Sequence, residues 1–487
     1  MTLTIDNPAL LKQQAYINGE WTAATTSQTF SVINPSSLER IAEVPDMGLD
    51  EIRTAIESAD KALPTWSGLT AKARANILRN WYQLILANQD DLAHLMTAEQ
   101  GKPVAEAKGE VIYGASFVEW FAEEAKRVYG DVIPAHGVDK RIITIKQPIG
   151  VVAAITPWNF PIAMITRKVA PALAVGCTVI VKPAKDTPLC ALALAELSEQ
   201  AGIPAGVFNV VTTNNSRAIG KALCEDSRVR KLSFTGSTPV GKILMRQCAD
   251  TVKKVSLELG GNAPFIVFDD ADIDAAVAGV MASKFRNAGQ TCVCTNRILV
   301  QDGVHDAFVA KLSTSVSTLK LGDGFGTGVT TGPLINAEAV EKVERLVADS
   351  IKQGANLRQN ADTAGLGENF YAPAVLTEVT PAMEIAGEEI FGPVATVFRF
   401  GSETEAIRIA NDTPFGLAAY FYARDIGRIW RVAEQLEYGM VGINEGIIST
   451  EVAPFGGVKE SGIGREGSKY GIDDFIEIKY LCMGGIS

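Results

Sequence analysis

The feature that most constrains the fold is an alternation of short apolar runs and helical patterns between residues 150 and 258. The β-rich apolar runs cover residues 151–155, 178–182, 207–211, 231–234 and 255–257, and the helical patterns cover residues 162–175, 189–201, 216–224 and 240–248. Strand–helix alternation of this kind is typical of a doubly wound parallel sheet with helices on both faces. A second α/β run follows, from about residue 261 to 455.

The N-terminal part carries amphipathic helical patterns that we expect to cover one face of this sheet. They comprise a helix that Asp50 could cap and that stops before Pro64, and stretches at residues 71–87, 90–98 and 103–128. Residues 141–147 alternate between inward and outward positions and predict a strand. Residues 475–480 predict another strand, which has no partner close by in the sequence.

Composition excludes several classes of function. A length of 487 residues suggests about three domains, and a net charge of -11 argues against nucleic acid or an anionic membrane as the main partner. No apolar run approaches the ~18 residues of a membrane span, and residues 1–14 lack the order of a secretory signal. Seven irregularly spaced cysteines indicate thiols in a reducing compartment. We therefore expect a cytoplasmic protein without nucleic-acid or membrane partners.

A cysteine loop at residues 285–297 is the strongest chemical signal. Cys292 follows Gly289, where an apolar helical pattern ends, and Arg286 and Arg297 flank it. A thiol placed in this way can be reached by a substrate and can be held partly as thiolate. The remaining thiols are expected to be buried and inert, apart from Cys294, which is discussed below; they are Cys177, Cys190, Cys224, Cys248 and Cys482.

A glycine-rich turn, Phe234-Thr-Gly-Ser-Thr-Pro-Val-Gly241, closes one predicted strand and opens a helix. Gly236 and Gly241 permit a tight turn and close backbone approach, and Ser237 or Thr238 can cap the helix. Free amides and the helix dipole suit a pyrophosphate. The spacing matches neither the dinucleotide fingerprint nor a P-loop, so the turn alone is a weak signal. The strand end Lys182-Pro-Ala-Lys185 adds to it, because nucleotides lie at the carboxyl ends of parallel strands.

Two further polar side chains follow predicted strands. Glu258 ends an apolar run just before two glycines, and Asn159 lies between aromatic residues, where its amide could stabilise an oxyanion. The three histidines, His94, His136 and His305, lie in no such motif. A Cys–His hydrolase is therefore disfavoured, Glu258 becomes the best candidate base, and no metal site is expected.

These motifs resemble the NAD(P)-dependent aldehyde dehydrogenase family over nearly the whole chain. The residues that carry the resemblance are Pro157-Trp-Asn-Phe-Pro161, Phe234-Thr-Gly-Ser237, Glu258-Leu-Gly-Gly261, Gly289-Gln-Thr-Cys292, Glu389-Ile-Phe-Gly-Pro393 and Pro454-Phe-Gly-Gly457. Within the family, residues 285–294 and 461–471 are similar to the group that oxidises succinate semialdehyde, with glutarate semialdehyde as a close alternative. A broader aldehyde dehydrogenase, a CoA-acylating dehydrogenase and a non-catalytic binding protein remain as less favoured readings.

The resemblance implies an architecture and a partner. It implies a Rossmann-type cofactor domain (residues 1–127 and 147–257), an α/β catalytic domain (258–457), and a small β oligomerisation flap with the tail (128–146 and 458–487). In the family the flap pairs subunits, which would give the isolated strand at residues 475–480 its partner. A homodimer or homotetramer is expected.

The resemblance also implies roles for individual residues. Cys292 would attack the aldehyde, Asn159 and the Cys292 amide would hold the oxyanion, and Glu258 would activate the water that releases the acid. Lys182 and Glu389 would bind the ribose hydroxyls of the cofactor, with Phe391 near the nicotinamide riboside. Trp158 and the turn residues Gly236, Ser237 and Gly241 complete the expected cofactor site.

On the substrate side, Arg167, Arg286 and the hydroxyl of Ser449 match positions that hold the substrate carboxylate in the semialdehyde group. Phe160 and Phe455 are further candidates for the substrate site. The pair Cys292 and Cys294 could form a labile disulfide, although ordinary packing of Cys294 is at least as plausible.

Cofactor choice is predicted from the end of the strand at residues 178–182. Many relatives that prefer NAD carry an acid three residues after the strand-end lysine, where this chain has Lys185. An acid there would accept hydrogen bonds from the ribose and repel a 2′-phosphate, whereas Lys182 and Lys185 would attract it. We expect NADP or NAD as cofactor, with NADP favoured.

Overall fold

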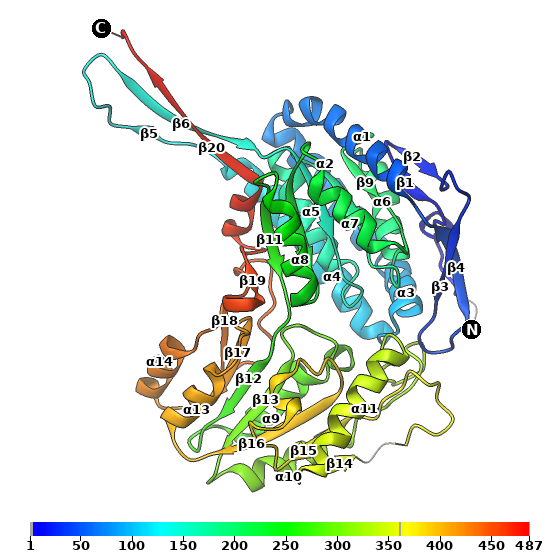
Figure 1. The fold of residues 1–487 in the computed structure, drawn as a ribbon, viewed down its shortest axis with the longest axis vertical. Helices are drawn as coiled ribbons and strands as arrows, with labels where there is room; N and C mark the ends of the chain where they lie inside the picture. The colour runs from blue at the N-terminus through cyan, green and yellow to red at the C-terminus, as the bar shows by residue number, and fades with distance from the viewer. Residues whose placement is uncertain (1–2, 360–361, 487) are drawn as a thin grey trace.

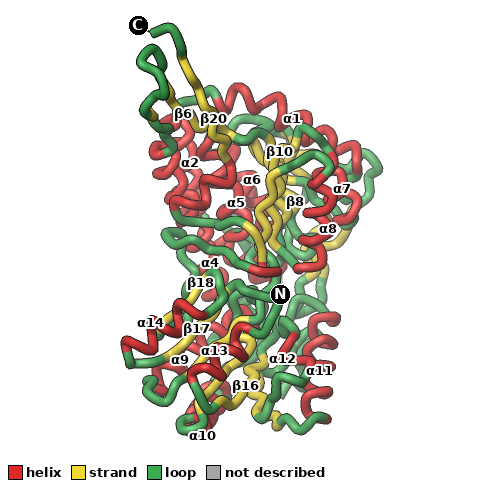
Figure 2. Tube along the Cα trace, turned by 60° about the vertical axis from the view of Figure 1, so that its left-hand side comes forward, coloured by secondary structure: helices red, strands yellow, loops and turns green. Residues whose placement is uncertain are grey.

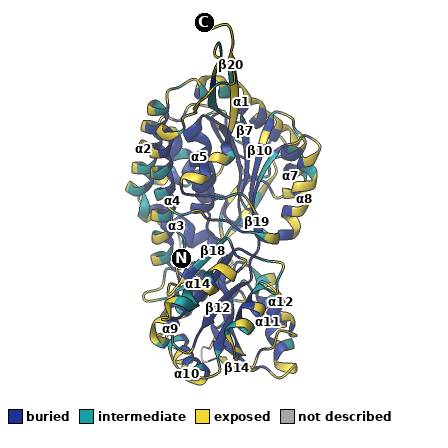
Figure 3. Ribbon diagram, turned by 90° about the vertical axis from the view of Figure 1, so that its left-hand side faces the viewer, coloured by how far each residue is buried: buried dark blue, intermediate teal, exposed yellow. Residues whose placement is uncertain are grey.

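A computed structural model describes residues 3–359 and 362–486 of the chain. Two α/β bodies, each built on its own sheet, lie one above the other, and a narrow β arm projects from the upper body (Figure 1). The turned views show the same two bodies meeting at a waist (Figure 2), with β19 (Gly462–Ile463) and β18 (Met440–Ile443) close to it (Figure 3).

The upper body is built on an eight-stranded sheet with the order β19-β11-β10-β7-β8-β9-β1-β2. Its parallel strands are β7 (Val151–Ile155), β8 (Thr178–Lys182), β9 (Phe208–Val210), β10 (Val229–Thr235) and β11 (Lys254–Glu258). The antiparallel edges are β1 (Ala15–Ile17), β2 (Glu20–Thr22) and β19 (Gly462–Ile463). The chain runs outward from β7 through β8 to β9 and then returns to β10 and β11 on the other side of β7. This order confirms the doubly wound sheet, and its topological switch point lies between β7 and β10.

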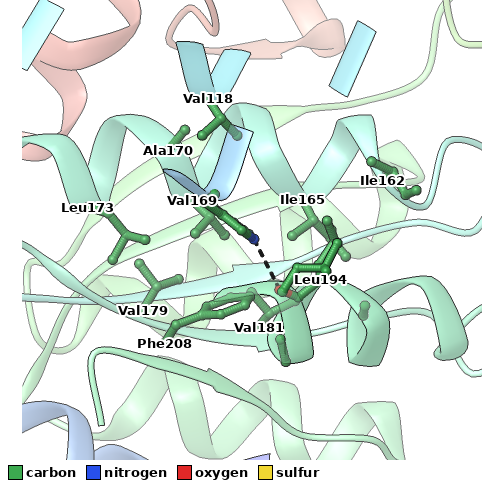
Figure 4. Close-up of a cluster of buried hydrophobic side chains, with 14 of the residues drawn as sticks. Val118, Ile162, Ile165, Val169, Ala170, Leu173, Val179, Val181, Leu194 and Phe208 are labelled. Atoms are coloured by element: carbon green, nitrogen blue, oxygen red, sulfur yellow. Dashed lines mark hydrogen bonds between the residues drawn. The ribbon is translucent and has the colours of Figure 1, made fainter. Parts of the chain in front are cut away.

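Helices cover both faces of this sheet, because alternate residues of each buried strand point to opposite sides. Val152 and Ala154 pack with α2–α6, whereas Val151 and Ala153 pack with α1, α7 and α8. The helices are α1 (Leu49–Ser67), α2 (Ala71–Ala87), α3 (Gln89–Gln100), α4 (Val104–Glu124), α5 (Ala163–Val175), α6 (Leu189–Gln200), α7 (Ser216–Glu225) and α8 (Thr238–Ala249). Figure 4 shows part of this core, where Val169 and Leu173 of α5 lie over Val179 of β8.

The lower body is built on a seven-stranded sheet with the order β14-β15-β16-β13-β12-β17-β18, in which only the edge strand β14 is antiparallel. Its strands are β12 (Ala263–Val267), β13 (Thr295–Gln301), β14 (Asn356–Gln359), β15 (Ala374–Thr377), β16 (Val394–Phe400), β17 (Ala418–Tyr422) and β18 (Met440–Ile443). Its helices are α9 (Ile273–Lys284), α10 (His305–Val316), α11 (Ala337–Lys352), α12 (Glu384–Gly387), α13 (Glu403–Asn411) and α14 (Ile426–Gln435). A separate hairpin, β3 (Thr29–Ile33) with β4 (Arg40–Pro45), lies beside the upper body.

The projecting arm is a three-stranded antiparallel sheet of β5 (Val132–Ile133), β6 (Arg141–Pro148) and β20 (Ile476–Met483). The register runs from Ile476 opposite Pro148 to Met483 opposite Arg141. The C-terminal strand therefore finds its partner within its own chain, so it does not need another subunit to be paired. Cys482 lies exposed on this arm, so the expectation that it is buried is wrong.

Two expectations for the first helix are also wrong. Gly48 occupies the N-cap position in place of Asp50, and the Glu51 carboxylate accepts a hydrogen bond from the Gly48 amide at 2.8 Å. The helix continues through Pro64 to Ser67. Its last turn holds Trp66, which is fully buried and donates from Nε1 to the Leu173 carbonyl at 3.1 Å. Burial of this large aromatic side chain outweighs the hydrogen bond that proline removes.

Among the described residues, no helix combines the length and apolar character needed to cross a bilayer.

Candidate active site

A cleft of about 280 Å³ opens where residues of the upper body meet residues of the lower body. Its lining consists of Pro157, Trp158, Asn159, Thr235, Gly236, Ser237, Leu259, Gly260, Cys292, Ala339, Lys342, Glu389, Ile390 and Phe391. Seven of the candidate site residues predicted from the sequence are among them: Trp158, Asn159, Gly236, Ser237, Cys292, Glu389 and Phe391. The cleft lies just beyond the carboxyl ends of β7 and β10, at the switch point of the upper sheet.

The loop before Cys292 is held in an unusual backbone conformation. After α9 ends at Lys284, Asn287 and Ala288 adopt φ values of 51° and 53°, and Gly289 follows at 77°. A Cβ on Gly289 would lie 2.2 Å from the carbonyl oxygen of Gly392, so only glycine fits there. Consecutive residues in this region are strained, and such strain often marks functional sites. The result is a sharp turn that brings the Cys292 thiol to the cleft.

Cys292 is half-buried, and burial raises the pKa of its thiol to about 12, although Arg167 opposes the shift. Burial and the nearby carboxylates of Glu389 and Glu258 thus disfavour the thiolate that the neighbouring arginines would favour. The sequence showed the flanking arginines but not how deep the sulfur lies. Arg297 does not act on the thiol: it is buried and donates to the carbonyls of Asn262, Ile409 and Ala410. A proton acceptor is needed when Cys292 reacts.

Glu258, the last residue of β11, is a buried carboxylate with an unsatisfied oxygen. Glu258 is 2% exposed, and Oε2 has no hydrogen-bond partner in the part of the chain that the structure describes. Burial, followed by the neighbouring charge of Glu466, raises its pKa well above the usual value, against the opposing effect of Arg167. A carboxyl group shifted in this way accepts protons more readily near neutral pH. A Cβ on Gly456 would lie 2.9 Å from Oε1, so the glycine makes room for the carboxylate.

Asn159 is clamped by backbone and side-chain hydrogen bonds. Its carbonyl accepts from Lys102 Nζ at 2.8 Å and from Asn287 Nδ2 at 3.0 Å. Its own Nδ2 donates to the Gln290 carbonyl at 2.9 Å. An amide nitrogen carries two hydrogens, so one N–H of Asn159 remains to serve a ligand. These bonds tie the amide to the loop that carries Cys292.

The glycines of the β10–α8 turn are required by packing rather than by backbone conformation. A Cβ on Gly236 would lie 2.4 Å from the Phe234 ring, and one on Gly241 would lie 2.4 Å from Leu259. Neither glycine has a positive φ. Ser237 occupies the N-cap position of α8, but its side chain makes no capping hydrogen bond, so the expected cap is absent. The N-terminus of α8 thus keeps amides that can receive an anion.

The other expected cofactor residues surround the same cleft or lie beside it. Glu389 Oε1 accepts a hydrogen bond from the Gly261 amide at 3.0 Å, and burial raises the pKa of this carboxyl to about 7. The rings of Trp158 and Phe391 meet edge to face with centroids 5.7 Å apart. Lys182 is buried at the end of β8, and burial lowers its pKa to about 8.

Lys185 lies apart from this cleft. It is exposed in the loop after β8. It lines a second cavity of about 400 Å³ together with residues of strand β3. Its side chain is therefore accessible to any part of a bound cofactor that extends beyond Lys182.

The two candidate arginines differ in their environment. Arg167 on α5 is 1% exposed, pairs with Glu466 through Nε, and lies with its guanidinium carbon 4.4 Å from the centre of the Phe455 ring. Within residues 3–359 and 362–486, its Nη2 has no hydrogen-bond partner. Arg286 is half-buried and lies 5.3 Å from the centre of the Phe160 ring.

Ser449 is half-buried in the segment that follows β18. Cys294 is buried behind Cys292, and its sulfur donates to the Lys284 carbonyl at 3.4 Å.

Sequence reasoning missed two charged residues that organise the site. Glu466, buried within the glycine-rich segment at residues 461–471, pairs with both Arg167 and Lys168. Lys102 pairs with Glu110 and holds Asn159. The one sequence signal for Glu466 was its position as a charged residue in a glycine-rich segment. Nothing local marks Lys102, because Asn159, which it holds, lies 57 residues further along the chain.

Comparisons with known proteins agree with this geometry. The sequence pattern of the aldehyde dehydrogenase family matches residues 21–481. A glutarate-semialdehyde dehydrogenase of Pseudomonas aeruginosa is 62% identical over 484 residues, which cover 99% of this chain and 100% of that one. The NADP(+) succinate-semialdehyde dehydrogenase GabD of Escherichia coli is 61% identical over 482 residues, with 99% and 100% coverage. A 3-sulfolactaldehyde dehydrogenase of Pseudomonas putida is 60% identical over 484 residues, with 99% coverage of both chains.

Among solved structures, the crystal structure of an E. coli NADP-dependent enzyme superposes with a TM-score of 0.97 at 61% identity, covering 99% of this chain and 100% of that one.

Proposed function

This chain belongs to the aldehyde dehydrogenase family, and we propose that it oxidises succinate semialdehyde to succinate with NADP as the preferred hydride acceptor. The observation that carries the substrate assignment is the pair of guanidinium groups near Cys292. Arg167 is buried with an unsatisfied Nη2, and Arg286 is half-buried over Phe160. An ω-semialdehyde brings a carboxylate that must leave water on binding, and cations of this kind can replace its hydration.

The names of the relatives support an anionic substrate. Succinate semialdehyde, glutarate semialdehyde and 3-sulfolactaldehyde each join an aldehyde to a carboxylate or a sulfonate, and they appear in the names of proteins 60–62% identical to this chain. Glutarate semialdehyde is the second candidate, because the relative that acts on it is as similar as the succinate-semialdehyde enzyme.

The cleft has the groups that a dinucleotide cofactor requires. The N-terminus of α8 lacks a side-chain cap, which suits a pyrophosphate, and Lys182 and Glu389 supply a cation and a carboxylate for ribose hydroxyls. A nicotinamide cofactor bound there accepts a hydride from the substrate carbon. We propose that Trp158 and Phe391 form the apolar wall against which the cofactor is held.

The residues of the chain would perform the remaining chemistry. Cys292 adds to the aldehyde carbon, and its proton passes to an acceptor, since burial raises the pKa of the thiol. The free N–H of Asn159 and the Cys292 amide stabilise the oxyanion. Glu258 then takes a proton from the water that attacks the Cys292 thioester, which releases the acid. Its unsatisfied Oε2 and raised pKa fit this role.

A panel of aldehydes tests the substrate assignment. We expect kcat/KM to be highest for succinate semialdehyde, lower for glutarate semialdehyde, and lower again for uncharged propanal and cationic betaine aldehyde. Loss of a charge-assisted contact of ~1.5–3 kcal/mol corresponds to roughly ten-fold or more in kcat/KM. A panel in which propanal equals the semialdehydes would contradict carboxylate recognition while leaving aldehyde oxidation intact.

Cofactor preference is predicted to depend on Lys185. The wild-type enzyme should use NADP at least as well as NAD, and Lys185→Glu should reverse the order, because it replaces an attraction to the 2′-phosphate by a repulsion. Since Lys185 is exposed, the expected change in the ratio of the two kcat/KM values is roughly ten-fold and weakens with salt.

Lys72→Glu is the matched control for this prediction, because it makes the same charge change on the exposed surface of α2. Steady-state kinetics with both cofactors measures the ratios. A wild-type enzyme that hardly uses NADP would show the assignment of Lys185 to be wrong.

The projecting arm supports self-association. Its exposed side chains include the apolar residues Val132 and Ile478, which are 86% and 67% exposed, and its outer strands leave unpaired edges. We propose a homodimer or homotetramer joined through this arm, and a cytoplasmic location for the enzyme.

A further inference from the structure

A buried lysine between α3 and α4 contacts the residue to which we assign the oxyanion. Lys102 is 2% exposed, and its Nζ donates to the Asn159 carbonyl at 2.8 Å and lies 4.0 Å from the centre of the Phe160 ring. Its counter-ion is Glu110 of α4. Because the cost of taking both charges out of water offsets much of their attraction, a buried pair of this kind is weak evidence for stability. Its contribution here lies in where it places its neighbours.

Glu110 extends this hold to the next helix. Its Oε1 accepts hydrogen bonds from the backbone amides of Ile162 and Ala163 at 3.0 and 3.3 Å, where α5 begins. The first amides of a helix have no partner within the helix, so the carboxylate satisfies two donors that would otherwise be unpaired. Lys102 and Glu110 therefore fix the chain at Asn159 and again at the start of α5.

The same part of the chain also holds the loop that carries the nucleophile. Gln100 accepts from the Lys102 amide at 3.0 Å and donates through Nε2 to the Asn287 side chain at 3.0 Å. Glu106 accepts from the Asn287 amide at 2.9 Å. These bonds brace a residue whose φ is 51°. Residues 100–110, the end of α3 and the first turns of α4, thus contact both segments that supply the proposed oxyanion donors.

The side chain of Asn159 depends on this support. Its Nδ2 donates to the Gln290 carbonyl at 2.9 Å, and its Oδ1 has no hydrogen-bond partner among the residues that the structure describes. A single side-chain bond does not fix the amide by itself, so the direction of its free N–H depends on where the backbone lies. An oxyanion donor must lie roughly 2.7–3.1 Å from the oxygen, and a misplacement of about 1 Å can cost ~10²-fold in rate.

We propose that Lys102 is a positioning residue for the oxyanion: by holding the Asn159 carbonyl next to Glu110, it sets the Asn159 amide at the distance from the Cys292 amide that a tetrahedral intermediate requires. The inference rests on the proposed role of Asn159 as an oxyanion donor. Addition of the thiol and hydrolysis of the thioester both form an oxyanion at the same carbon, so Lys102 affects both. Lys102 is not among the residues that line the cleft, so cofactor affinity does not depend on it.

A neutral double variant tests this role without leaving a buried charge unpaired. Lys102→Met combined with Glu110→Gln removes both charges, and the glutamine carbonyl can still accept from the α5 amides. We expect the rate of the first turnover and kcat both to fall by roughly 10–10²-fold. KM for the aldehyde and the dissociation constant of NADP should stay close to the wild-type values. Stopped-flow absorbance of the reduced nicotinamide gives the two rates, and a fluorescence titration gives the dissociation constant.

A double-mutant cycle with Asn159→Ala separates positioning from general damage to the fold. Asn159→Ala alone should lose ~10²–10³-fold in kcat. Adding Lys102→Met and Glu110→Gln should cost no more than about two-fold further, because no amide is left to position. Lys231→Met is the matched control: it removes another buried lysine of the upper body, whose Nζ donates to Ser256, and it should leave kcat near the wild-type value.

Urea unfolding monitors each variant, and Lys102→Gln with Glu110→Gln serves in the same way if the methionine variant does not fold. The role of Lys102 is overturned if the folded neutral variant keeps the wild-type kcat, if its loss adds in full to that of Asn159→Ala, or if the loss lies in KM or in cofactor affinity. A wild-type kcat in Asn159→Ala would instead overturn the oxyanion role of Asn159, and the inference with it.

Discussion

Glu258→Gln is expected to release one equivalent of reduced cofactor in a rapid burst and then to turn over about 10²–10⁴-fold more slowly than the wild type. Addition of Cys292 and the first hydride transfer use the thiol and the Asn159 amide, which the substitution leaves in place, with the thiol proton passing to an acceptor other than Glu258. Hydrolysis of the thioester needs a base for water, and glutamine cannot accept the proton. Stopped-flow absorbance of the reduced nicotinamide separates the two phases.

The same experiment has a pH signature. Because burial raises the pKa of Glu258, the fraction of ionised base and the rate of hydrolysis should increase with pH in the wild type. The slow phase of Glu258→Gln should lose this dependence. Glu341→Gln, the same chemical change on the exposed surface of α11, is the matched control, and Cys292→Ala should give no burst. A first turnover in Glu258→Gln that is as slow as its later ones would argue against Glu258 as the hydrolytic base.

Much of the upper sheet could be predicted from the sequence. The strands at residues 151–155 and 178–182 are found with the expected bounds, because a strand buried on both faces is a continuous apolar run that ends at a turn. The end of α1 could not be predicted from local preference. Pro64 argues for a stop, but Trp66 finds a buried site and a hydrogen bond to Leu173 across the fold, and that tertiary contact decides the length.

Motif residues of the site could be predicted, but their electrostatics could not. Cys292 and Asn159 carry recognisable neighbours in the sequence, and both line the cleft. The charge state of the thiol depends on how completely distant segments enclose it, which no local pattern shows. The same holds for Glu466, whose contact with Arg167 joins residues about 300 positions apart.

These contacts decide which arginine offers the clearer test of substrate recognition. Arg167→Ala would leave the buried Glu466 with one cation fewer, and breaking a buried ion pair typically costs ~3–5 kcal/mol of stability. A loss of activity in that variant would therefore combine a folding defect with a binding defect. Arg286 lies over the Phe160 ring and forms no direct ion pair among the described residues. Its charge acts on Glu106, but that carboxylate keeps Lys102 and the Asn287 amide when Arg286 is removed.

Arg286→Ala is accordingly expected to raise KM for succinate semialdehyde by about ten-fold or more, the equivalent of a charge-assisted contact of ~1.5–3 kcal/mol. KM and kcat for propanal should stay close to the wild-type values, because propanal has no carboxylate to bind. Arg286→Lys should recover part of the loss, since it keeps the charge but not the planar, two-pronged geometry that matches a carboxylate. Urea unfolding of each variant monitors the fold, with the free energy of unfolding expected to remain near that of the wild type. If propanal oxidation falls as far as succinate semialdehyde oxidation, Arg286 supports the loop that carries Cys292 and does not select the substrate.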